Sequence, residues 1–321
     1  MIPVEAITAW RARKPWRDDR QVAQDLLLSA LAIEIASDPL TGPSLVWRGG
    51  TCLHQLHLAA PARYSEDLDY VLLAGTARYR DLDAAFARIA GRLDVSLRGD
   101  PVHEPTRYRA FVRAAVAGLA PVELEVEINS ADAAPALDLV APRLAVDVPA
   151  WYEGEAAVTT YQAPELAGTK FRALSQRRKG RDLWDLDLAR SELRIADGEL
   201  AVAAAHYLRH ERISPTQFRA RLASHVTTSE FLTDLDPLLV AGLGSYDAAE
   251  VARRVIVWSD AWLDPLLPTH EQRRSPTEAS DGLVRCPEYA AHDGSLTRCD
   301  QLVAPGAACP SHPDLAAVAA W

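Results

Sequence analysis

A double glycine at the end of a short apolar run, followed about one helix later by two closely spaced aspartates, limits how this chain can fold. The glycines are Gly49 and Gly50, and the aspartates Asp67 and Asp69 flank Leu68. Residues on a strand alternate between its two faces, so both aspartates would share one face while the leucine points into the core. The sequence therefore predicts a sheet that presents two neighbouring carboxylates on one side.

Two carboxylates a few ångströms apart repel each other unless a cation lies between them. Their oxygens are the hard ligands that Mg²⁺ prefers, and Mg²⁺ commonly binds together with substrate phosphates. Glycines allow a backbone to approach a phosphate closely. The alternative is that Asp67 and Asp69 are solvated residues at a strand end. The glycines upstream favour a metal-dependent, phosphate-handling site.

Hydrophobic spacing and turn residues predict an α+β fold, with a sheet and flanking helices, a helical C-terminal domain and a Cys-rich tail. The expected helices are residues 21–35, 51–58, 77–93, 163–176 and 182–190, with a helical pattern through 198–266; the expected strands are 45–47, 67–73, 108–117 and 122–128. The predicted domains are an α/β domain at 20–162, a helical domain at 163–267, a linker at 268–284 and a tail at 285–321.

The segment at 122–128 alternates strictly between aliphatic residues and Glu123, Glu125 and Glu127. Such alternation is typical of a strand with one buried face. One interpretation is an edge strand with a solvated acidic face. The other is that one glutamate joins the two aspartates in a metal site.

The net charge of −10 argues against a protein that coats nucleic acid, although it allows a local basic patch. One such patch contains Arg172, Arg177, Arg178, Lys179 and Arg181, which we interpret either as a solvated turn or as an RNA-contacting surface. No apolar run approaches the ~18 residues that a membrane span needs, and no apolar signal core follows the N-terminal basic residues. We expect a cytoplasmic protein without a membrane partner.

The order of these motifs resembles the AbiEii/AbiGii toxin family. The matching residues are a strand followed by Gly-Gly-Thr at 49–51, Arg-x-Ser-Glu-Asp-x-Asp at 63–69, Val-Glu-Ile-Asn at 126–129, Leu-Ala-Gly-Thr-Lys at 166–170, and Arg-Asp-x-x-Asp at 181–185. The family comprises bacterial nucleotidyltransferases of the polymerase-β type that form the toxin half of abortive-infection and toxin–antitoxin pairs. The resemblance covers roughly residues 20 to 265.

The resemblance implies roles for individual positions. For nucleotide binding it implies Gly49, Gly50, Thr51, Ser65 and Lys170; for Mg²⁺ binding Asp67 and Asp69, with Glu127 as the third carboxylate; and for catalysis Asp67, Asp69, Lys170 and Asp182. Lys170 would place a compact positive charge on the triphosphate. Asp182 would accept a proton or orient Lys170 and Arg181, and Asp185 is a second acidic position whose role stays open. A salt bridge without catalytic meaning between Lys170 and Asp182 is the alternative.

By this resemblance the protein is a Mg²⁺-dependent transferase that moves NMP from an NTP to an acceptor. The implied acceptor is the 3′ end of tRNA, the implied outcome is blocked translation, and the implied partner is a cognate antitoxin. Two alternatives stay open: transfer to a small molecule or a protein, and a regulator that binds NTP without turnover. A turnover-free regulator would not need the acidic pair and Lys170 together.

The C-terminal tail gathers Cys286, Cys299, Cys309 and His312, which could form a tetrahedral Zn²⁺ site, with His292 as an alternative ligand. The segment is too short for a hydrophobic core, so either a metal folds it or it is largely disordered. A disulfide is disfavoured in a reducing compartment.

Overall fold

The computed structural model describes residues 1–60, 62–99, 106–130, 134–240 and 246–267, with six short strands beyond residue 283. Seven strands form the central sheet: β1 (Leu45–Arg48), β2 (Leu68–Leu72), β3 (Ser96–Gly99), β4 (Arg107–Ala114), β5 (Val122–Asn129), β6 (Leu139–Val140) and β9 (Thr160–Tyr161). Their order is β3-β4-β5-β2-β1-β9-β6. The β2–β5 and β1–β9 pairs are parallel and the other pairs are antiparallel, so the sheet is mixed.

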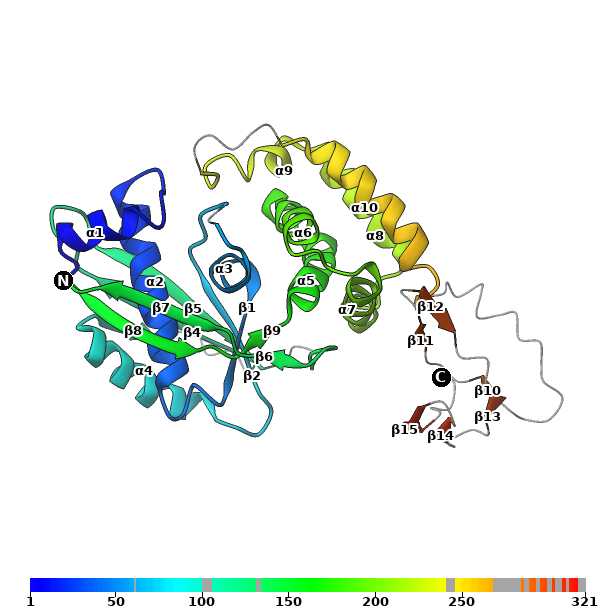
Figure 1. Ribbon diagram of the computed structural model, residues 1–321, viewed down its shortest axis with the longest axis horizontal. Coiled ribbons are helices and arrows are strands. Elements are labelled where there is room, and N and C mark those ends of the chain that lie inside the picture. The colour runs from blue at the N-terminus through cyan, green and yellow to red at the C-terminus, as the bar shows by residue number, and fades with distance from the viewer. Residues whose placement is uncertain are drawn as a thin grey trace.

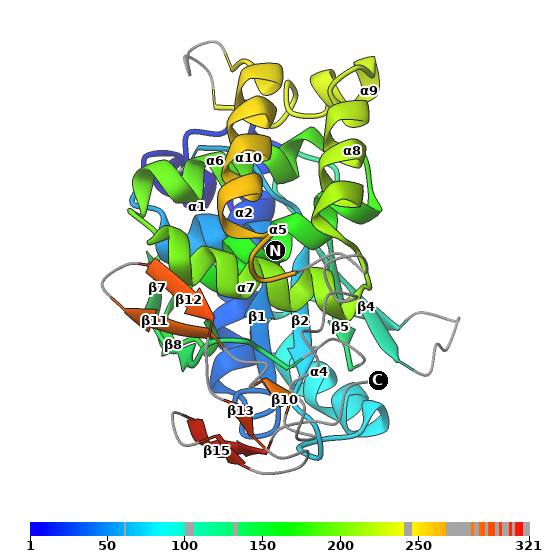
Figure 2. The same ribbon diagram turned by 90° about the vertical axis from the view of Figure 1, so that its right-hand side faces the viewer.

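The helices fall into two groups (Figure 1). Beside the sheet are α1 (Val4–Arg11), α2 (Asp19–Ser37), α4 (Tyr79–Leu93) and the short α3 (Gly49–Cys52), which continues as a π-helical turn at Leu53–His57. The second group is α5 (Ala163–Gln176), α6 (Gly180–Glu192), α7 (Asp197–His210), α8 (Pro215–His225), α9 (Ser229–Thr233) and α10 (Ala248–Trp262). Figure 2 shows α5, α7, α8 and α10 of this second group from the side away from the sheet.

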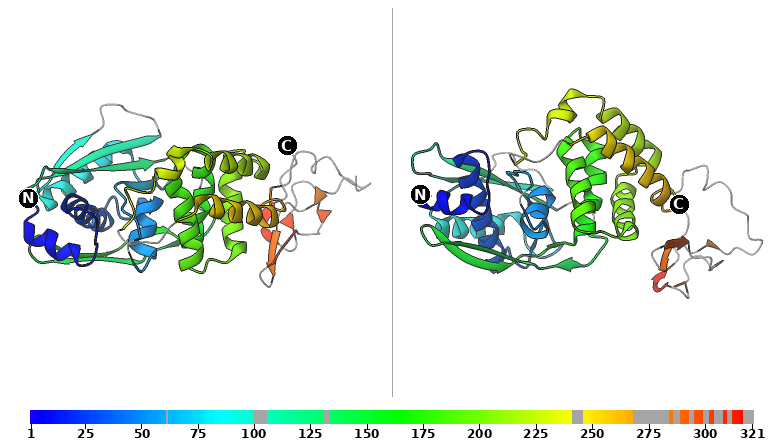
Figure 3. Two further views of the ribbon diagram at one scale, coloured as in Figure 1. Left: turned by 90° about the horizontal axis from the view of Figure 1, so that it is seen from above. Right: turned by 45° about the horizontal axis from the view of Figure 1, so that its top comes forward.

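Helix α2 is the central helix of the sheet half. Its N-cap Asp18 accepts a hydrogen bond from the backbone N–H of Gln21 at 2.8 Å. Twelve of its residues are buried, because the sheet and α4 cover one side and the hairpin of β7 (Arg143–Val148) and β8 (Tyr152–Ala157) covers the other (Figure 3). A helix that is apolar on most sides requires such cover.

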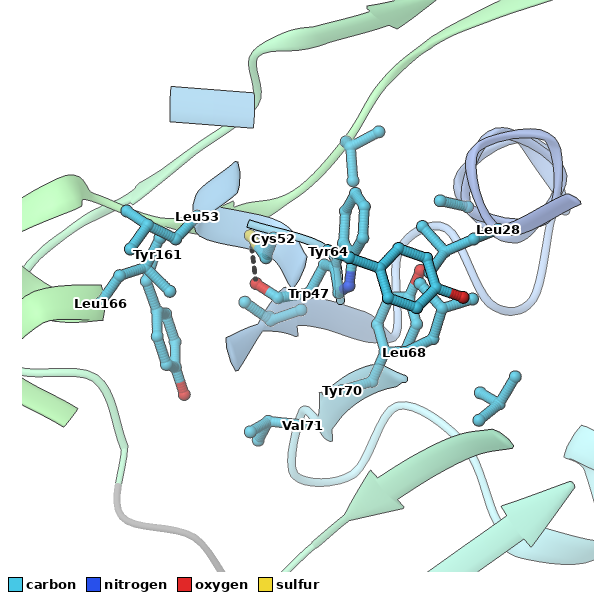
Figure 4. Close-up of a cluster of buried hydrophobic side chains, with 14 of the residues drawn as sticks. Leu28, Trp47, Cys52, Leu53, Tyr64, Leu68, Tyr70, Val71, Tyr161 and Leu166 are labelled. Atoms are coloured by element: carbon cyan, nitrogen blue, oxygen red, sulfur yellow. Dashed lines mark hydrogen bonds between the residues drawn. The ribbon is translucent and has the colours of Figure 1, made fainter. Parts of the chain in front are cut away.

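The core around β1 and β2 fixes the strand that carries the aspartates (Figure 4). Trp47 stacks on Tyr70 with ring centroids 6.2 Å apart. The thiol of Cys52 donates to the carbonyl of Trp47 at 3.5 Å. Because Leu68 and Tyr70 are buried, the residue between them, Asp69, is turned to the opposite face.

The structure confirms the mixed fold and the main predicted elements. One interpretation of the segment at 122–128 was wrong: β5 is not an edge strand, because it lies between β4 and β2. Helix α1, strand β3 and the β7–β8 hairpin were not predicted. Among the described residues, no helix is both long and apolar enough to cross a membrane.

Most of the predicted linker and tail lies outside the described residues, including Cys286 and Cys299. The described tail segments are β10 (Val284–Arg285), β11 (Tyr289–His292), β12 (Ser295–Arg298), β13 (Leu302–Val303), β14 (Ala308–Cys309) and β15 (His312–Ala316). Cys309 and His312 are backbone neighbours across the β14–β15 hairpin. Because two of the four proposed ligands lie outside the described residues, the zinc site stays a prediction.

Candidate active site

A polar cleft of about 360 Å³ lies where the sheet meets α5 and α6. Its volume falls within the ~300–1,000 Å³ range of small-molecule pockets. The lining combines an acidic wall from β2 and β5 with a basic wall from the helices. The residues are Gly50, Thr51, Arg63, Tyr64, Ser65, Glu66, Asp67, Asp69, Glu125, Glu127, Lys170, Arg177, Arg181, Asp182 and Leu238. The cleft thus gathers most of the predicted catalytic and nucleotide-binding residues.

The two glycines are required by contacts inside the protein. Gly49 has a φ of +86°, which favours glycine, and a Cβ there would lie 2.5 Å from Oδ2 of Asp69. A Cβ on Gly50 would lie 2.2 Å from Nη2 of Arg63 and 2.9 Å from Oδ2 of Asp185. Each glycine therefore makes room for a charged side chain of the site.

The acidic wall is set by strand register. Asp69 on β2 is the register partner of Glu127 on the parallel strand β5, so their side chains lie on the same face. Asp67 directly precedes β2 and lines the same cleft. Glu127 also contacts Arg107 of β4, with Nη1 and Oε2 3.6 Å apart. The predicted third carboxylate is thus a neighbour of the aspartate pair.

The charge of Asp69 helps to raise the pKa of two neighbouring carboxyl groups, Asp67 and Glu127. Partial burial, the charge of Asp69 and the charges of Glu66 and Glu125 raise the pKa of Asp67 to about 6. Burial and the charge of Asp69 likewise raise the pKa of Glu127. The cause is desolvation together with like-charge repulsion. A cation bound here would relieve the repulsion.

The donor set suits Mg²⁺, because all three groups are carboxylates and crowd one cleft. Within the part of the chain that the structure describes, no three His, Cys, Asp or Glu side chains already converge on a single point. The fit to a metal therefore rests on the chemistry of Asp67, Asp69 and Glu127 and on their mutual repulsion.

The basic wall is a cluster of alternating charges that is buried except at Arg177, whose side chain is 53% exposed. Lys170 Nζ lies 2.7 Å from Asp185 Oδ2 and 3.2 Å from Asp182 Oδ1. Arg63 donates to Asp185 from Nε and Nη2, both at 2.6 Å. Arg177 donates to Asp182 from Nε at 2.8 Å and from Nη2 at 3.0 Å. Three cations thus surround two anions, leaving one positive charge in excess on the side that faces the cleft.

Asp182 and Asp185, the two aspartates of this charge cluster, are held ionised. Burial would raise the pKa of Asp182, but Lys170 and Arg177 outweigh burial and lower it. Burial opposes ionisation of Asp185 too, yet Arg63 and Lys170 hold its pKa well below the usual value. A carboxylate with a low pKa is a poor proton acceptor. Of the two roles predicted for Asp182, the geometry therefore favours orienting Lys170 over accepting a proton.

Further polar contacts support this cluster from the sheet side. The Thr51 hydroxyl donates to the Ser65 hydroxyl at 2.7 Å, so both predicted hydroxyl groups meet at the cleft. Behind them, Nε2 of the buried His54 lies 3.0 Å from Asp185 Oδ1. Burial lowers the pKa of His54, so its imidazole is neutral at neutral pH. His54 therefore adds a hydrogen bond to Asp185 and no charge.

The side chains of the predicted basic patch have different surroundings. Arg177 and Arg181 line the cleft. Lys179 lies 3.5 Å from Asp234, and the guanidinium carbon of Arg172 lies 5.6 Å from the Tyr207 ring centroid. Arg178 is exposed, and no ion-pair partner for it is found among the described residues.

Three participants were not predicted from the sequence: Arg63, Glu125 and the central position of Asp185. Arg63 begins the Arg-x-Ser-Glu-Asp-x-Asp motif, and this position could have marked it as a residue of the site. Glu125 stands two residues before Glu127 on β5 and therefore shares its face. For Asp185, the spacing of three residues from Asp182 on one helix indicated a shared face.

Asp67→Asn is expected to stabilise the metal-free protein at pH 8 and to have almost no effect at pH 3, below both pKa values of Asp67. The folded-state pKa of Asp67 is about 6 and its ordinary value is 3.8, so the destabilisation appears as pH rises through this interval and is complete above it. Asp67 borders solvent, which screens the repulsion, so we expect a gain of about 1 kcal/mol. Thermal unfolding at both pH values measures it. Asp94→Asn, at a side chain that is 97% exposed, is the control; equal stability of Asp67→Asn and wild type at pH 8 would contradict the prediction.

Comparison with known proteins gives a family match and several structural matches, including the following two. The model of the nucleotidyl transferase AbiEii toxin family, from type IV toxin–antitoxin systems, matches residues 31–253, which is more than half of the chain. No curated protein sequence matches. The nucleotidyltransferase toxin MenT4 from Mycobacterium tuberculosis H37Rv has a TM-score of 0.58 at 14% identity, covering 84% of this chain and 92% of its own.

The second structural match is a putative nucleotidyltransferase from H. pylori, at 19% identity and a TM-score of 0.41, covering 77% of this chain and 96% of its own. The MenT4 match supports a shared fold, whereas the second is too distant to add to it.

Proposed function

Because this chain belongs to the AbiEii family of nucleotidyl transferase toxins from type IV toxin–antitoxin systems, we propose that its cleft transfers NMP from an NTP to the 3′ end of an RNA, most simply a tRNA. The protein is a nucleotidyltransferase of toxin type, and the acceptor, the metal and the site residues are the parts that we propose. Blocked translation would be the outcome, a separate antitoxin the partner, and the cytoplasm the place of action.

The observation that carries the proposal is the division of one cleft into an acidic and a basic wall. Asp67, Asp69 and Glu127 stand on the first wall, and Lys170 and Arg177 on the second. A triphosphate with a bound cation has the complementary charges. The acidic wall suits the cation and the basic wall suits the phosphate oxygens.

Asp67 and Asp69, with Glu127 beside them, would hold Mg²⁺. When bound, the metal would supply charge stabilisation at the attacking and leaving oxygens. Lys170 binds a phosphate oxygen through Nζ, and Asp182 orients it. The hydroxyls of Thr51 and Ser65 donate hydrogen bonds to the nucleotide. In this proposal the sheet supplies the acidic side chains and helices α5 and α6 supply the basic ones. The helical domain at 163–267 would thus complete the active site.

The acceptor RNA is proposed to approach along the turn at residues 177–181. Arg178 is exposed on this turn, next to Arg177 and Arg181 at the cleft. Guanidinium groups bind phosphates without reading bases, so the turn would position the end of an RNA chain rather than select its sequence.

The test is incubation of the purified protein with Mg²⁺, total tRNA and each of the four α-labelled NTPs in turn. We expect label on RNA with at least one NTP. Label on a small product or on protein alone would exclude RNA as the acceptor. NTP binding without release of pyrophosphate would exclude catalysis of this transfer.

Arg178→Glu is expected to lower RNA labelling about five- to tenfold while the affinity for NTP stays unchanged. Loss of one phosphate contact weakens RNA binding and lowers the salt-dependence slope by about one. RNA labelling at several salt concentrations measures both effects. The control is Arg80→Glu on α4, whose side chain is 69% exposed and does not line the cleft. Equal losses in the two variants would rule out a specific role for the turn.

A further inference from the structure

We infer that Arg63 is a positioning residue: by binding Asp185, it prevents that carboxylate from neutralising Lys170 and so leaves the Lys170 charge available to the triphosphate. The inference rests on the proposed function, in which Lys170 binds the nucleotide. It assigns a role to a residue whose guanidinium group is directed at a buried aspartate.

The contacts of Arg63 are those of a residue held in one position. Its side chain is 3% exposed, and three of its nitrogen atoms donate hydrogen bonds. Nε and Nη2 bind the two oxygens of Asp185, and Nη1 donates to the Tyr64 carbonyl at 3.1 Å. A planar guanidinium can make this two-point contact, whereas an ammonium group cannot.

Asp185 is the carboxylate that Arg63 and Lys170 share. Its Oδ2 lies 2.6 Å from Arg63 Nη2 and 2.7 Å from Lys170 Nζ, and its side chain is fully buried. Without Arg63, Lys170 would be the only cation among the described residues within hydrogen-bonding distance of Asp185, because His54 is neutral. An unpaired buried carboxylate is strongly unfavourable. Lys170 would then be bound more tightly to Asp185, and the cluster would lose its excess positive charge.

Gly50 makes this arrangement sterically possible. Its ideal Cβ position lies 2.2 Å from Nη2 of Arg63, so any other residue would displace the guanidinium. The backbone around Arg63 is also fixed, because it forms a bridge with Leu239 and the neighbouring Tyr64 N–H donates to the Leu238 carbonyl at 2.7 Å. Gly50, Arg63 and Asp185 therefore pack against one another, and Asp185 in turn contacts Lys170.

The experiment measures dissociation constants for ATP, GTP, CTP and UTP with Mg²⁺, together with thermal stability, for wild type and three variants. Arg63→Gln should weaken binding of the preferred NTP about tenfold, the effect of a lost contact to a charged group. The double variant Arg63→Gln with Asp185→Asn removes one charge of each sign and restores the excess positive charge. It should bind within threefold of wild type.

The control is Arg88→Gln, which breaks an Arg–Asp contact outside the cleft: the half-exposed Arg88 donates to the fully buried carboxylate of Asp38 at 3.0 to 3.2 Å. It should lower the unfolding temperature and leave NTP affinity unchanged, so it separates loss of stability from loss of binding.

The outcomes distinguish the alternatives. NTP affinity of Arg63→Gln within twofold of wild type, measured on folded protein, overturns the inference and leaves the proposed function intact. Failure of the double variant to recover affinity also overturns it, because restoring the charge balance of the cluster would then not restore NTP binding. Wild-type protein that binds none of the four NTPs overturns the proposed function and the inference together.

Discussion

Asp69→Asn is expected to reduce nucleotide transfer by at least a thousandfold while the protein stays folded. The substitution keeps the shape of the side chain that packs against Gly49 and removes its negative charge. A neutral amide is a weaker ligand for Mg²⁺, and charge stabilisation by a bound metal is worth several kcal/mol in a transition state. Each 1.36 kcal/mol of lost transition-state stabilisation lowers the rate tenfold. A loss of several kcal/mol therefore lowers the rate of transfer by about a thousandfold or more.

Labelled-NTP transfer by Asp69→Asn is compared with transfer by Asp94→Asn, the same chemical change at a side chain that is 97% exposed. The control should match wild type. Melting curves should show that both variants are folded. If Asp69→Asn kept more than a tenth of wild-type activity, the assignment of the acidic wall to the metal site would be wrong.

Asp185→Ala is expected to lower the free energy of unfolding by about 3–5 kcal/mol, the usual effect of removing one partner of a buried ion pair. The side chain is fully buried and is bound by Arg63, Lys170 and His54. Its removal leaves two buried cations facing each other. Combining Asp185→Ala with Arg63→Gln should lower the free energy of unfolding much less than Asp185→Ala alone.

Urea unfolding measures this loss, with Asp187→Ala as the matched control. Asp187 lies on the same helix but pairs with Arg254 near the surface, where ion pairs contribute at most about 1 kcal/mol. Because the pKa of Asp185 is held well below its ordinary value of 3.8, its stabilisation is fully present above that pH and is lost in stronger acid. The difference should therefore be constant from pH 5 to pH 8. Equal losses in the two variants would show that Asp185 does not hold the cluster together.

Local sequence patterns sufficed for the strands and helices that carry the acidic wall. Apolar residues on either side of Asp69 dictate which way it faces, because the alternation of a strand needs no long-range information. The same applies to the glutamates on β5. Helix α5 has the bounds that its spacing predicted, and Pro164 stands in its first turn.

The pairing of strands that are far apart in the chain could not be predicted from local sequence patterns. The glutamate strand was equally consistent with an edge position, since alternation describes one strand and says nothing about its neighbours. The hairpin at 143–157 was missed although β7 alternates between buried apolar and exposed residues, because β8 has no such clear pattern and the pairing of the two strands against α2 is not visible in either strand alone.

The sequence alone determined the chemistry that the chain carries: a glycine pair, an aspartate pair on one strand face, and a lysine near two aspartates on consecutive helices. These follow from residue type and from the local period of strand and helix. Only the tertiary structure decided what the glycines are for and how the lysine is held. Gly50 makes room for Arg63, which is 122 residues from its partner Asp185. Steric fit and buried charge pairing act between atoms a few ångströms apart, and chain folding sets which residues those are.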